Sequence, residues 1–598
     1  MQEAHMKDIT EIRRQEFKDS GYPETNRIGK TEERMLPAGG GFRLRTLLYI
    51  PDGEGPFPTL LYRTPYPGMQ AEAKAVAEEF CKRGFAYVIQ MCRGTNGSEG
   101  DWEPNVYEKE DGAAVLNWLD EQDWCESIGL FGCSYMAYTC WAASQSVNDK
   151  VKAMYVTHYG SDRYASLYRS GLFKMDLMTG WAKDNAGFPI EAGLLESCRY
   201  IPQVEVDEAL WGKRLDWYRN WITHTEKSDP YWHEGFWEEL YQAPGKMKIP
   251  VYVGAGWFDH HYGGTLTSFL DLGAEAARHS HLRIGAWNHG FNPCLEGYQG
   301  KDLRNSDVKS SLDWFTGILK DKKLPERQVS LYIIGADLWK DFDEFPVPAD
   351  EVKYFYLNAD RTLSPEAERD IHPDNKQNEQ CDMKPDTDID SEAFCAAAAA
   401  DQVQKDRSGT GTKVSYVYDP EDPVMSHGAE SMFTTKSEIG SLLQPGPDYR
   451  ADVISFVSEP FSEEMTVCGA MKLYLYVSSD AEDTAFTAKI MEVQPDGKAY
   501  NIRTSIKTLA FREGEEKRGS YTPGEIVEVV LDNWEVAWKF QKGSRLRIDV
   551  SSSDFPQYAI HTNYPGVWSL QDKTRKAVQT LYMDSEHPCR IELPCIRL

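Results

Sequence analysis

The sequence predicts a mainly parallel α/β fold that is interrupted by a helical segment and completed by an all-β domain. In the first 160 residues, short apolar segments of strand length alternate with amphipathic segments of helix length. This alternation is typical of βαβ units, which build parallel sheets with helices on both faces. Beyond residue 351, short alternating strands dominate and no long helix is evident, which is typical of a β-sandwich or jelly roll.

A chain of 598 residues is too long for one hydrophobic core, so several domains are expected. The changes of pattern along the chain indicate where one domain ends and the next begins. We predict four segments: the first part of the α/β core at 1–160, a helical cap at 161–248, the second part of the core at 249–348, and a jelly-roll domain at 349–598.

Charge and cysteine content narrow the class of function. The net charge of −29 argues against nucleic acid or an anionic membrane as a partner, because both need basic surfaces. The chain has no run of about 18 apolar residues that could cross a membrane, and its N-terminus lacks the apolar core of a secretory signal. The twelve cysteines include no CxxC pair and no cysteine–histidine cluster at zinc spacing. We therefore expect a cytoplasmic protein with reduced thiols and with neither a metal nor a cofactor.

The first elements follow a polar N-terminal arm. Three segments are alternating or continuously apolar, as the strands of a half-buried or buried sheet are. Two further segments are amphipathic with the period of a helix, and the first of them ends at a glycine, Gly84. The predicted strands are 42–50, 59–63 and 86–91, and the predicted helices are 71–83 and 108–121.

The most informative segment is 128–144, which reads IGLFGCSYMAYTCWAAS. A short apolar strand is followed by a tight turn that carries Ser134, and then by a segment of helical character. This layout is that of a nucleophile elbow, which exposes a hydroxyl at the end of a strand. The alternative is that Ser134 merely caps the helix, but the flanking strand and helix favour a nucleophile. Cys133 is a rival, although strand alternation points its side chain the other way.

The α/β pattern stops after a further predicted strand at 151–158. From 161 to 248 the chain has no clear strand and is rich in tryptophan and tyrosine. We predict a helical insertion over the sheet, whose aromatic side chains either form its own core or line a binding pocket. The α/β pattern then resumes, with predicted strands at 249–254 and 281–284, helices from about 264 and at 308–320, and a linker at 345–348.

The last part of the chain contains short segments that alternate between apolar and polar residues. They predict strands at 353–357, 465–477, 486–493, 525–531 and 545–550. The polar stretch 364–412 interrupts this pattern, and we predict that it is a long surface insertion.

Candidate partners for Ser134 follow two later strands. Asp259 lies just beyond the strand at 249–254, and His289 lies in the loop after the strand at 281–284. The carboxyl ends of parallel strands meet at one edge of a sheet, and the chain order serine, aspartate, histidine is that of an α/β-hydrolase. We therefore predict an α/β-hydrolase fold in which these residues form a catalytic triad. Histidines that neighbour Asp259 or begin a strand fit the role of the base less well than a loop histidine. The rivals are His158, His260, His261 and His281.

Six phrases of the sequence carry a resemblance to known proteins. They are GCSY at 132–135, GWFD at 256–259, WNHG at 287–290, RTPY at 63–66, RGTNGSEG at 93–100 and HTEKSDPYW at 224–232. Together they resemble the cocaine esterase/X-Pro dipeptidyl-peptidase (CocE/NonD) family of serine hydrolases, over nearly the whole chain. The resemblance implies a helical cap and a C-terminal jelly roll. It also implies a triad of Ser134, Asp259 and His289. The oxyanion hole that it implies is made by the hydroxyl of Tyr66 and the backbone N–H of Tyr135.

The residues and the resemblance together predict a metal-free serine hydrolase that acts on a small-molecule ester or amide through an acyl-enzyme. Our first interpretation is a carboxylesterase for bulky or aromatic acyl groups, because the cap is aromatic and the dipeptidyl-peptidases of the family are usually longer. The alternatives are an X-Pro dipeptidyl-peptidase, a hydrolase of α-amino-acid esters or β-lactam amides, and a catalytically silent carbohydrate-binding protein. Whether the protein forms a homo-oligomer is left open.

Overall fold

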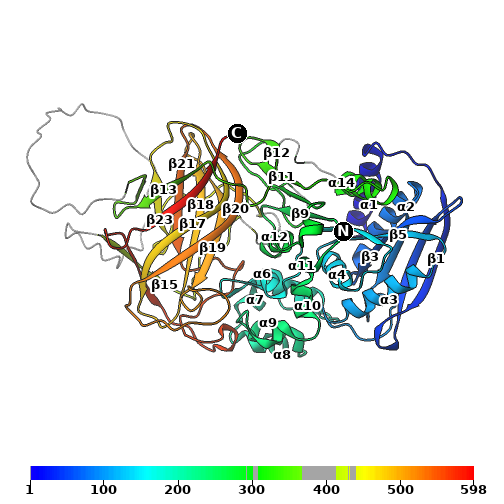
Figure 1. Ribbon diagram of the computed structural model, residues 1–598. Helices are drawn as coiled ribbons and strands as arrows, with labels where there is room; N and C mark the ends of the chain where they lie inside the picture. The colour runs from blue at the N-terminus through cyan, green and yellow to red at the C-terminus, as the bar shows by residue number, and fades with distance from the viewer. Residues whose placement is uncertain are drawn as a thin grey trace, which may run out of the picture.

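The computed structural model describes residues 2–290, 293–300, 303, 307–366, 412–428, 430 and 439–598. Two large sheets lie at opposite ends of the molecule, and a group of short helices lies beside the junction between them (Figure 1). The predicted insertion at 364–412 falls almost entirely outside the described residues. No helix in the described part of the chain has both the length and the apolar character needed to span a membrane.

The first sheet has ten strands in the order β1-β2-β4-β3-β5-β6-β9-β10-β11-β12. From β4 to β11 neighbouring strands pair in parallel, whereas β1, β2 and β12 pair antiparallel at the two edges. The bounds are β1 Ile28–Pro37, β2 Arg43–Pro51, β3 Phe57–Thr64, β4 Ala86–Met91, β5 Cys125–Cys133, β6 Val151–Thr157, β9 Val251–Gly256, β10 His281–Gly285, β11 Gln328–Ile333 and β12 Leu338–Phe342.

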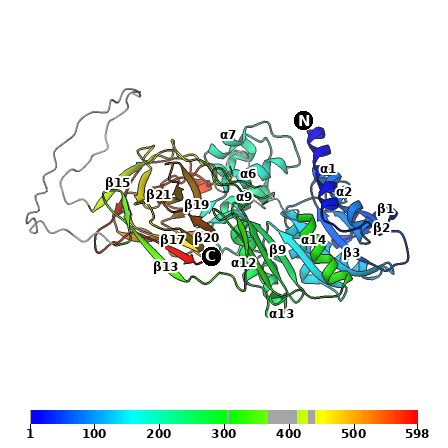
Figure 2. The ribbon, with the colours of Figure 1, turned by 90° about the horizontal axis from the view of Figure 1, so that it is seen from above.

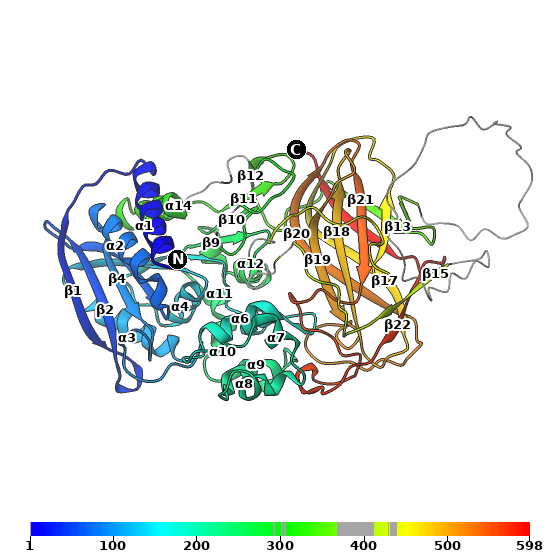
Figure 3. The same cartoon turned by 180° about the vertical axis from the view of Figure 1, so that it is seen from behind.

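Helices cover both faces of this sheet. On one face the ring of Phe131 in β5 lies between Phe80 of α2 and Phe315 of α14, with ring centroids 6.0 and 5.8 Å away. Helices α3 and α4 pack together on the other face (Figure 3). The bounds are α1 Gln2–Asp19, α2 Gln70–Lys82, α3 Glu108–Asp120, α4 Tyr135–Ala143, α12 Tyr262–Leu270, α13 Ala274–Ala277 and α14 Asp307–Phe315, which continues as a π-helical turn over Thr316–Lys320.

The N-terminal arm is structured, which corrects the expectation of a polar arm without elements. It contains helix α1 and strand β1, and α1 packs against α2 and α14. Strand β1 is almost entirely exposed and therefore lacks the apolar residues by which a strand is recognised. The sheet also continues beyond β10 through β11 and β12, which the sequence pattern did not indicate.

Between β6 and β9 the chain forms short helices and one small hairpin, β7 Tyr168–Arg169 with β8 Leu172–Phe173. Tyr218, Trp211 and Trp221 are among the aromatic residues buried in a core that belongs mainly to this segment. Much of the aromatic pattern therefore reflects packing. The helices are α5 Arg163–Leu167, α6 Met175–Asp184, α7 Leu194–Arg199, α8 Val206–Ala209, α9 Asp216–Thr223, α10 Trp237–Tyr241 and α11 Ala243–Lys246.

The C-terminal part is an all-β domain whose strands pair mostly antiparallel, seen from above in Figure 2. The one parallel pair of named strands is that of β14 with β16, among the described residues. Its jelly-roll layout and the domain boundaries stay predictions. The bounds are β13 Glu351–Leu357, β14 Thr362–Ser364, β15 Lys413–Tyr418, β16 Ile454–Ser458, β17 Met465–Ser479, β18 Ala485–Val493, β19 Ala499–Thr508, β20 Val527–Phe540, β21 Arg545–Ser551, β22 Ala577–Tyr582 and β23 Arg590–Ile596.

Candidate active site

A strained turn presents Ser134 between β5 and α4. Its backbone has φ 58° and ψ −129°, a conformation that L-residues rarely adopt and that costs about 1–3 kcal/mol. The turn is held by two hydrogen bonds: the Ser134 N–H donates to the carbonyl of Thr157 at 2.9 Å, and the Tyr138 N–H donates to the carbonyl of Ser134 at 3.0 Å. Gly132 is required because a Cβ there would lie 2.2 Å from the carbonyl oxygen of Met136. The local structure is that of the predicted nucleophile elbow.

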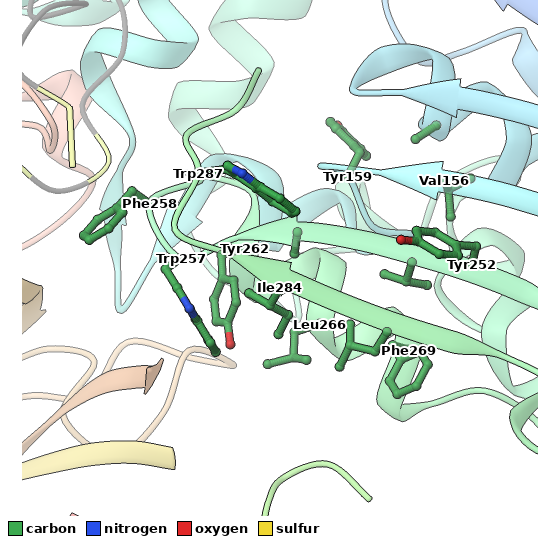
Figure 4. Packing of buried hydrophobic residues seen from close by; sticks show 14 of the residues in the cluster. Val156, Tyr159, Tyr252, Trp257, Phe258, Tyr262, Leu266, Phe269, Ile284 and Trp287 are labelled. Carbon is green, nitrogen blue, oxygen red and sulfur yellow. The ribbon is translucent and has the colours of Figure 1, made fainter. Parts of the chain in front are cut away.

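Buried tryptophans anchor the two loops that carry the other predicted residues. Trp257 follows β9 and donates through Nε1 to the carbonyl of Tyr332 at 2.9 Å. Trp287 follows β10 and donates through Nε1 to the carbonyl of Leu303 at 2.9 Å. Figure 4 shows both indoles near the ends of their strands, with Trp257 beside Tyr262 of α12 at 5.7 Å between ring centroids. The packing of these large side chains fixes the loops at the carboxyl edge of the sheet.

Ser134, His289 and Asp259 form one chain of hydrogen bonds. His289 Nε2 lies 2.8 Å from Ser134 Oγ, and His289 Nδ1 lies 2.9 Å from Asp259 Oδ1. An ionised carboxylate can only accept, so Nδ1 carries the proton and Nε2 is left to accept from the serine hydroxyl. Asp259 is completely buried, whereas His289 and Ser134 remain partly accessible. The arrangement can remove a proton from a serine that a ligand can reach.

A second histidine binds the other oxygen of the same carboxylate. His158 Nδ1 lies 2.7 Å from Asp259 Oδ2, and both side chains are fully buried. Burial by itself raises the pKa of Asp259, but the charges and hydrogen bonds of His289 and His158 lower it well below its ordinary value. Asp259 therefore stays ionised, and a histidine ring on each of its oxygens, together with the backbone N–H of His261 on Oδ1 at 3.0 Å, fixes the plane of the carboxylate. The sequence pattern offers His158 only as a rival base and does not indicate this positioning contact.

The remaining histidines do not reach Ser134 in this way. His260 stacks on His289 with ring centroids 4.3 Å apart, and burial lowers its pKa well below the ordinary value. Burial likewise lowers the pKa of His261. His281 lies on β10, where its Nε2 is bonded to the carbonyl of Glu326. His260 and His261 therefore stay neutral and line the cavity beside His289.

The thiol of Cys133 is a poor rival to the hydroxyl of Ser134. Burial raises the pKa of Cys133 to about 12, so the thiol is protonated near neutral pH and lacks the nucleophilic thiolate.

The two predicted oxyanion donors lie close to Ser134 and line the same cavity. The rings of Tyr66 and Tyr135 are 6.1 Å apart, and the backbone N–H of Tyr135 opens helix α4, where the first N–H groups have no intrahelical acceptor. Trp181 of α6 donates through Nε1 to the hydroxyl oxygen of Tyr66 at 2.9 Å. This bond leaves the phenol proton to donate elsewhere, and burial raises the pKa of Tyr66, so that the proton is retained. The sequence pattern does not distinguish Trp181 from the other aromatic residues of the predicted cap.

A cavity of about 430 Å³ surrounds the serine. Its walls include aromatic side chains from the segment between β6 and β9 and apolar side chains from the opposite, N-terminal side of the core. Those on the first side include Tyr159, Trp181 and Trp221. The volume lies in the range of small-molecule sites, about 300–1,000 Å³.

In the described part of the chain, His158, Asp259 and His289 also form a group that could share a metal ion, because their donor atoms lie within 4.8 Å of one another. Both oxygens of Asp259 and the Nδ1 atoms of both histidines are already used in hydrogen bonds within the group. A metal would have to displace these bonds.

Family models match two parts of the chain. Residues 40–291 match the model described as X-Pro dipeptidyl-peptidase (S15 family), and residues 322–592 match the one described as X-Pro dipeptidyl-peptidase C-terminal non-catalytic domain. The cocaine esterase of Rhodococcus sp. (strain MB1 Bresler) is 28% identical to the chain, covering 94% of this chain and 98% of that protein.

Solved structures share the fold over nearly the whole length. An aminopeptidase from a marine sediment archaeon, a thaumarchaeote, has a TM-score of 0.75 at 19% identity and covers 96% of this chain and 97% of its own. An α-amino acid ester hydrolase has a TM-score of 0.75 at 20% identity and covers 96% of this chain and 98% of its own. A CocE/NonD family hydrolase from Staphylococcus aureus has a TM-score of 0.60 at 17% identity, with 94% and 93% covered. At these identities the likeness shows the α/β-hydrolase fold with a C-terminal β domain.

Proposed function

The chain belongs to the S15 family of serine hydrolases, and from this premise we propose that it is a carboxylesterase for bulky or aromatic esters. The observation that carries the proposal is the hydrogen bond of 2.8 Å between Ser134 Oγ and His289 Nε2, continued at 2.9 Å from His289 Nδ1 to Asp259. Residues with these roles are needed for acyl transfer to a serine.

The proposed reaction follows from where the protons of Ser134 and His289 lie. His289 Nε2 accepts the hydroxyl proton while Ser134 Oγ attacks the ester carbonyl, and Asp259 stabilises the imidazolium that forms. The hydroxyl of Tyr66 and the backbone N–H of Tyr135 donate to the oxyanion of the tetrahedral intermediate. His289 then returns the proton to the leaving alcohol. Water, activated by the same histidine, releases the acid from the acyl-enzyme.

The walls of the cavity favour a neutral ester over a peptide with a free amino terminus. An aminopeptidase or X-Pro dipeptidyl-peptidase needs an anion to hold the substrate's ammonium group. Two carboxylates line the cavity, Glu72 and Asp307, among the described residues. Glu72 is paired with Arg13 at 2.7 Å, and Asp307 accepts from the Tyr155 hydroxyl at 2.6 Å. Neither is available as an unpaired anion.

The free-energy cost of building this site argues against a catalytically silent carbohydrate-binding protein. Ser134 is held in a strained backbone conformation beside a buried, ionised Asp259. Such strain and buried charge lower stability and are typical of catalytic sites.

Labelling with a fluorophosphonate probe tests the nucleophile. We expect the wild type to be labelled at Ser134 and Ser134→Ala to be unlabelled, with an unchanged melting temperature. Labelling of Ser134→Ala at the wild-type rate would refute the assignment.

A substrate screen tests the specificity. We expect turnover of chromogenic phenyl-substituted and aliphatic esters and at least about 100-fold lower kcat/KM for X-Pro and aminoacyl anilides, because an unpaired buried ammonium costs several kcal/mol. A preference for the anilides would favour the peptidase alternative.

A further inference from the structure

The cavity continues past Ser134 onto the face of the sheet that α2 and α14 cover. Phe131 and Cys133 alternate along β5, so both side chains point to this face. A residue on a central strand that is covered by helices on both faces is normally buried completely. Phe131 and Cys133 are only half-buried, and both line the cavity that contains Ser134. Open space therefore lies against them, under the helices.

Helix α1 forms the outer wall of this space. Ile9, Arg13 and Phe17 line the cavity, and the ring of Phe17 packs edge-on against Phe80 of α2 at 5.1 Å. Figures 1 and 3 show α1 beside α2 and α14 in opposite views. The match to the S15 family model begins at residue 40, so this wall is built by a part of the chain that precedes the matched region.

The walls of this part of the cavity, which we call the α1 branch, are mainly apolar, and their polar groups are paired charges and a few hydroxyls. The apolar contribution comes from Phe17, Val76, Phe80 and Phe131. The charged side chains neutralise one another or are bonded: Arg13 Nε donates to Glu72 at 2.7 Å, and burial raises the pKa of Asp307, which favours its neutral form. An ionic ligand would find no unpaired counter-charge among the described residues of the branch.

We propose that the α1 branch binds an unbranched apolar chain of the ester substrate, while the aromatic side of the cavity holds the other substituent. This assignment rests on the proposed esterase activity. The cavity of about 430 Å³ is on the order of three times the engineered 150 Å³ cavity that binds benzene, so it has room for groups on both sides of the serine. An apolar chain gains by leaving water, and a well-matched wall discriminates between chain lengths.

Filling the branch tests the assignment. Val76 lies on the face of α2 that lines the branch, and Val76→Phe places a phenyl ring there. We expect the ratio of kcat/KM for a decanoyl ester to that for an acetyl ester to fall at least about tenfold, because one methylene in an apolar pocket is worth about 10–200-fold. Lys74→Phe adds the same ring two residues away, where the side chain does not line the cavity, and should leave the ratio unchanged.

Two ester series identify which substituent enters the branch. Nitrophenyl esters of acetic to decanoic acid vary the acyl chain, and methyl to decyl benzoates vary the alcohol chain. If Val76→Phe loses the preference for long chains in either series, the result supports the branch. A loss in the nitrophenyl esters assigns the branch to the acyl side, and a loss in the benzoates assigns it to the alcohol side. Equal ratios in Val76→Phe and Lys74→Phe in both series would overturn the proposal. Val76→Ala widens the same wall and should favour longer chains, which keeps the test decisive if Val76→Phe does not fold.

Binding without turnover separates this proposal from the proposed function. Isothermal titration calorimetry of decanoate and of decanol is performed with Ser134→Ala and with Ser134→Ala/Val76→Phe. We expect one of the two ligands to bind the first protein and to bind the second at least about tenfold more weakly. Such binding in an enzyme that hydrolyses no ester would refute the esterase and support the branch. Ester hydrolysis by the wild type without this difference in binding would support the esterase and refute the branch.

Discussion

At the scale of single residues, Asp259 is held by a histidine on each side. His158 occupies a backbone conformation with φ 59°, which non-glycine residues adopt rarely, and it donates to Asp259 Oδ2 from a position without solvent contact. Its ring keeps the carboxylate from turning away from His289. We therefore regard His158 as a positioning residue and His289 as the base.

His158→Asn should separate these two roles. Asparagine tolerates positive φ, but its side chain is too short to make the same bond to Asp259. We expect kcat to fall about tenfold, the value of one hydrogen bond to a charged group, with little change in KM. His289→Ala should cost orders of magnitude more, nearly as much as Ser134→Ala, because a triad acts as a unit. Steady-state kinetics on one ester would contradict the assignment if His158→Asn were as damaging as His289→Ala.

The pH dependence of stability should reflect the buried histidines. Burial lowers the pKa of His260 and His261 well below the unfolded value of about 6.5, so below that pH the unfolded chain binds protons that the folded protein does not. Stability then falls as the pH falls from 7 to 5, by at most about 1.4 kcal/mol per pH unit for each group. His261→Gln should reduce the slope of the unfolding free energy against pH, measured by urea denaturation.

His233 provides a control, because its contribution to the pH dependence of stability has the opposite sign. A hydrogen bond to Glu238 raises the pKa of this partly exposed histidine, so the folded protein binds the proton more tightly than the unfolded chain. Its contribution to stability is present at low pH and is lost as the pH rises through the folded value. His233→Gln should therefore steepen the slope slightly, because solvent screens the pair. If His261→Gln left the slope of the unfolding free energy against pH unchanged, His261 would take up its proton in the folded protein as it does in the unfolded chain.

At the scale of elements, helix α6 of the segment between β6 and β9 reaches the proposed oxyanion site. Trp181 donates to the Tyr66 hydroxyl at 2.9 Å, and its indole stacks on the ring of Tyr135 with centroids 6.2 Å apart. This segment therefore orients one proposed oxyanion donor and packs on the residue that carries the other. It does more than cover the cavity.

A double-mutant cycle tests this coupling. Tyr66→Phe removes the donor and keeps the ring, so kcat should fall about 10²–10³-fold with little change in KM. Trp181→Phe removes the indole donor and part of the ring that packs on Tyr135, and we expect a fall of about tenfold, mainly through misorientation of the Tyr66 hydroxyl. The double variant should be no slower than Tyr66→Phe, since Trp181 acts through Tyr66. Additive losses would show that Trp181 acts by a route other than Tyr66, such as its packing on Tyr135.

At the scale of the whole molecule, the β domain supports the loop that carries Asp259. Arg503 of β19 donates to the carbonyl of Trp257, two residues before Asp259, and pairs with Glu430 at 3.1 Å. Both charged side chains are buried. The contact joins the two sheets at the active site, so we expect the domains to depend on each other for stability.

Arg503→Met should be strongly destabilising. Among the described residues it leaves Glu430 with the more distant Arg169, at 3.8 Å, as its remaining ion-pair partner, and it removes the donor to Trp257. Breaking a buried pair by removing one partner costs about 3–5 kcal/mol, which urea denaturation can measure. Lys498→Met removes one partner of an exposed pair with Asp496 in the same domain and should produce no measurable change. Similar urea midpoints for the two variants would show that this interface contributes little to the stability of the protein.

The sequence by itself determined the elements whose apolar pattern is strong and the local chemistry of the nucleophile. Strand β4 and the strand–turn–helix around Ser134 follow from the spacing of apolar residues, because burial on both faces of a parallel sheet demands it. The chain order of Ser134, Asp259 and His289 also predicted that these side chains would meet, since strand ends share one edge of the sheet. Strand β1 left no such signal because it is exposed.

Only the tertiary structure decided what surrounds these residues. That His158 binds Asp259 and that Trp181 binds Tyr66 depends on contacts between residues 101 and 115 positions apart. Helix α1 has few apolar residues and lies in the segment predicted only as a polar arm, yet it closes one side of the cavity by packing on α2 and α14. Periodicity reports which face of an element is buried but not which element buries it. The partners across the cavity are chosen by the packing of the whole chain, and with them the size and polarity of the space beside the serine.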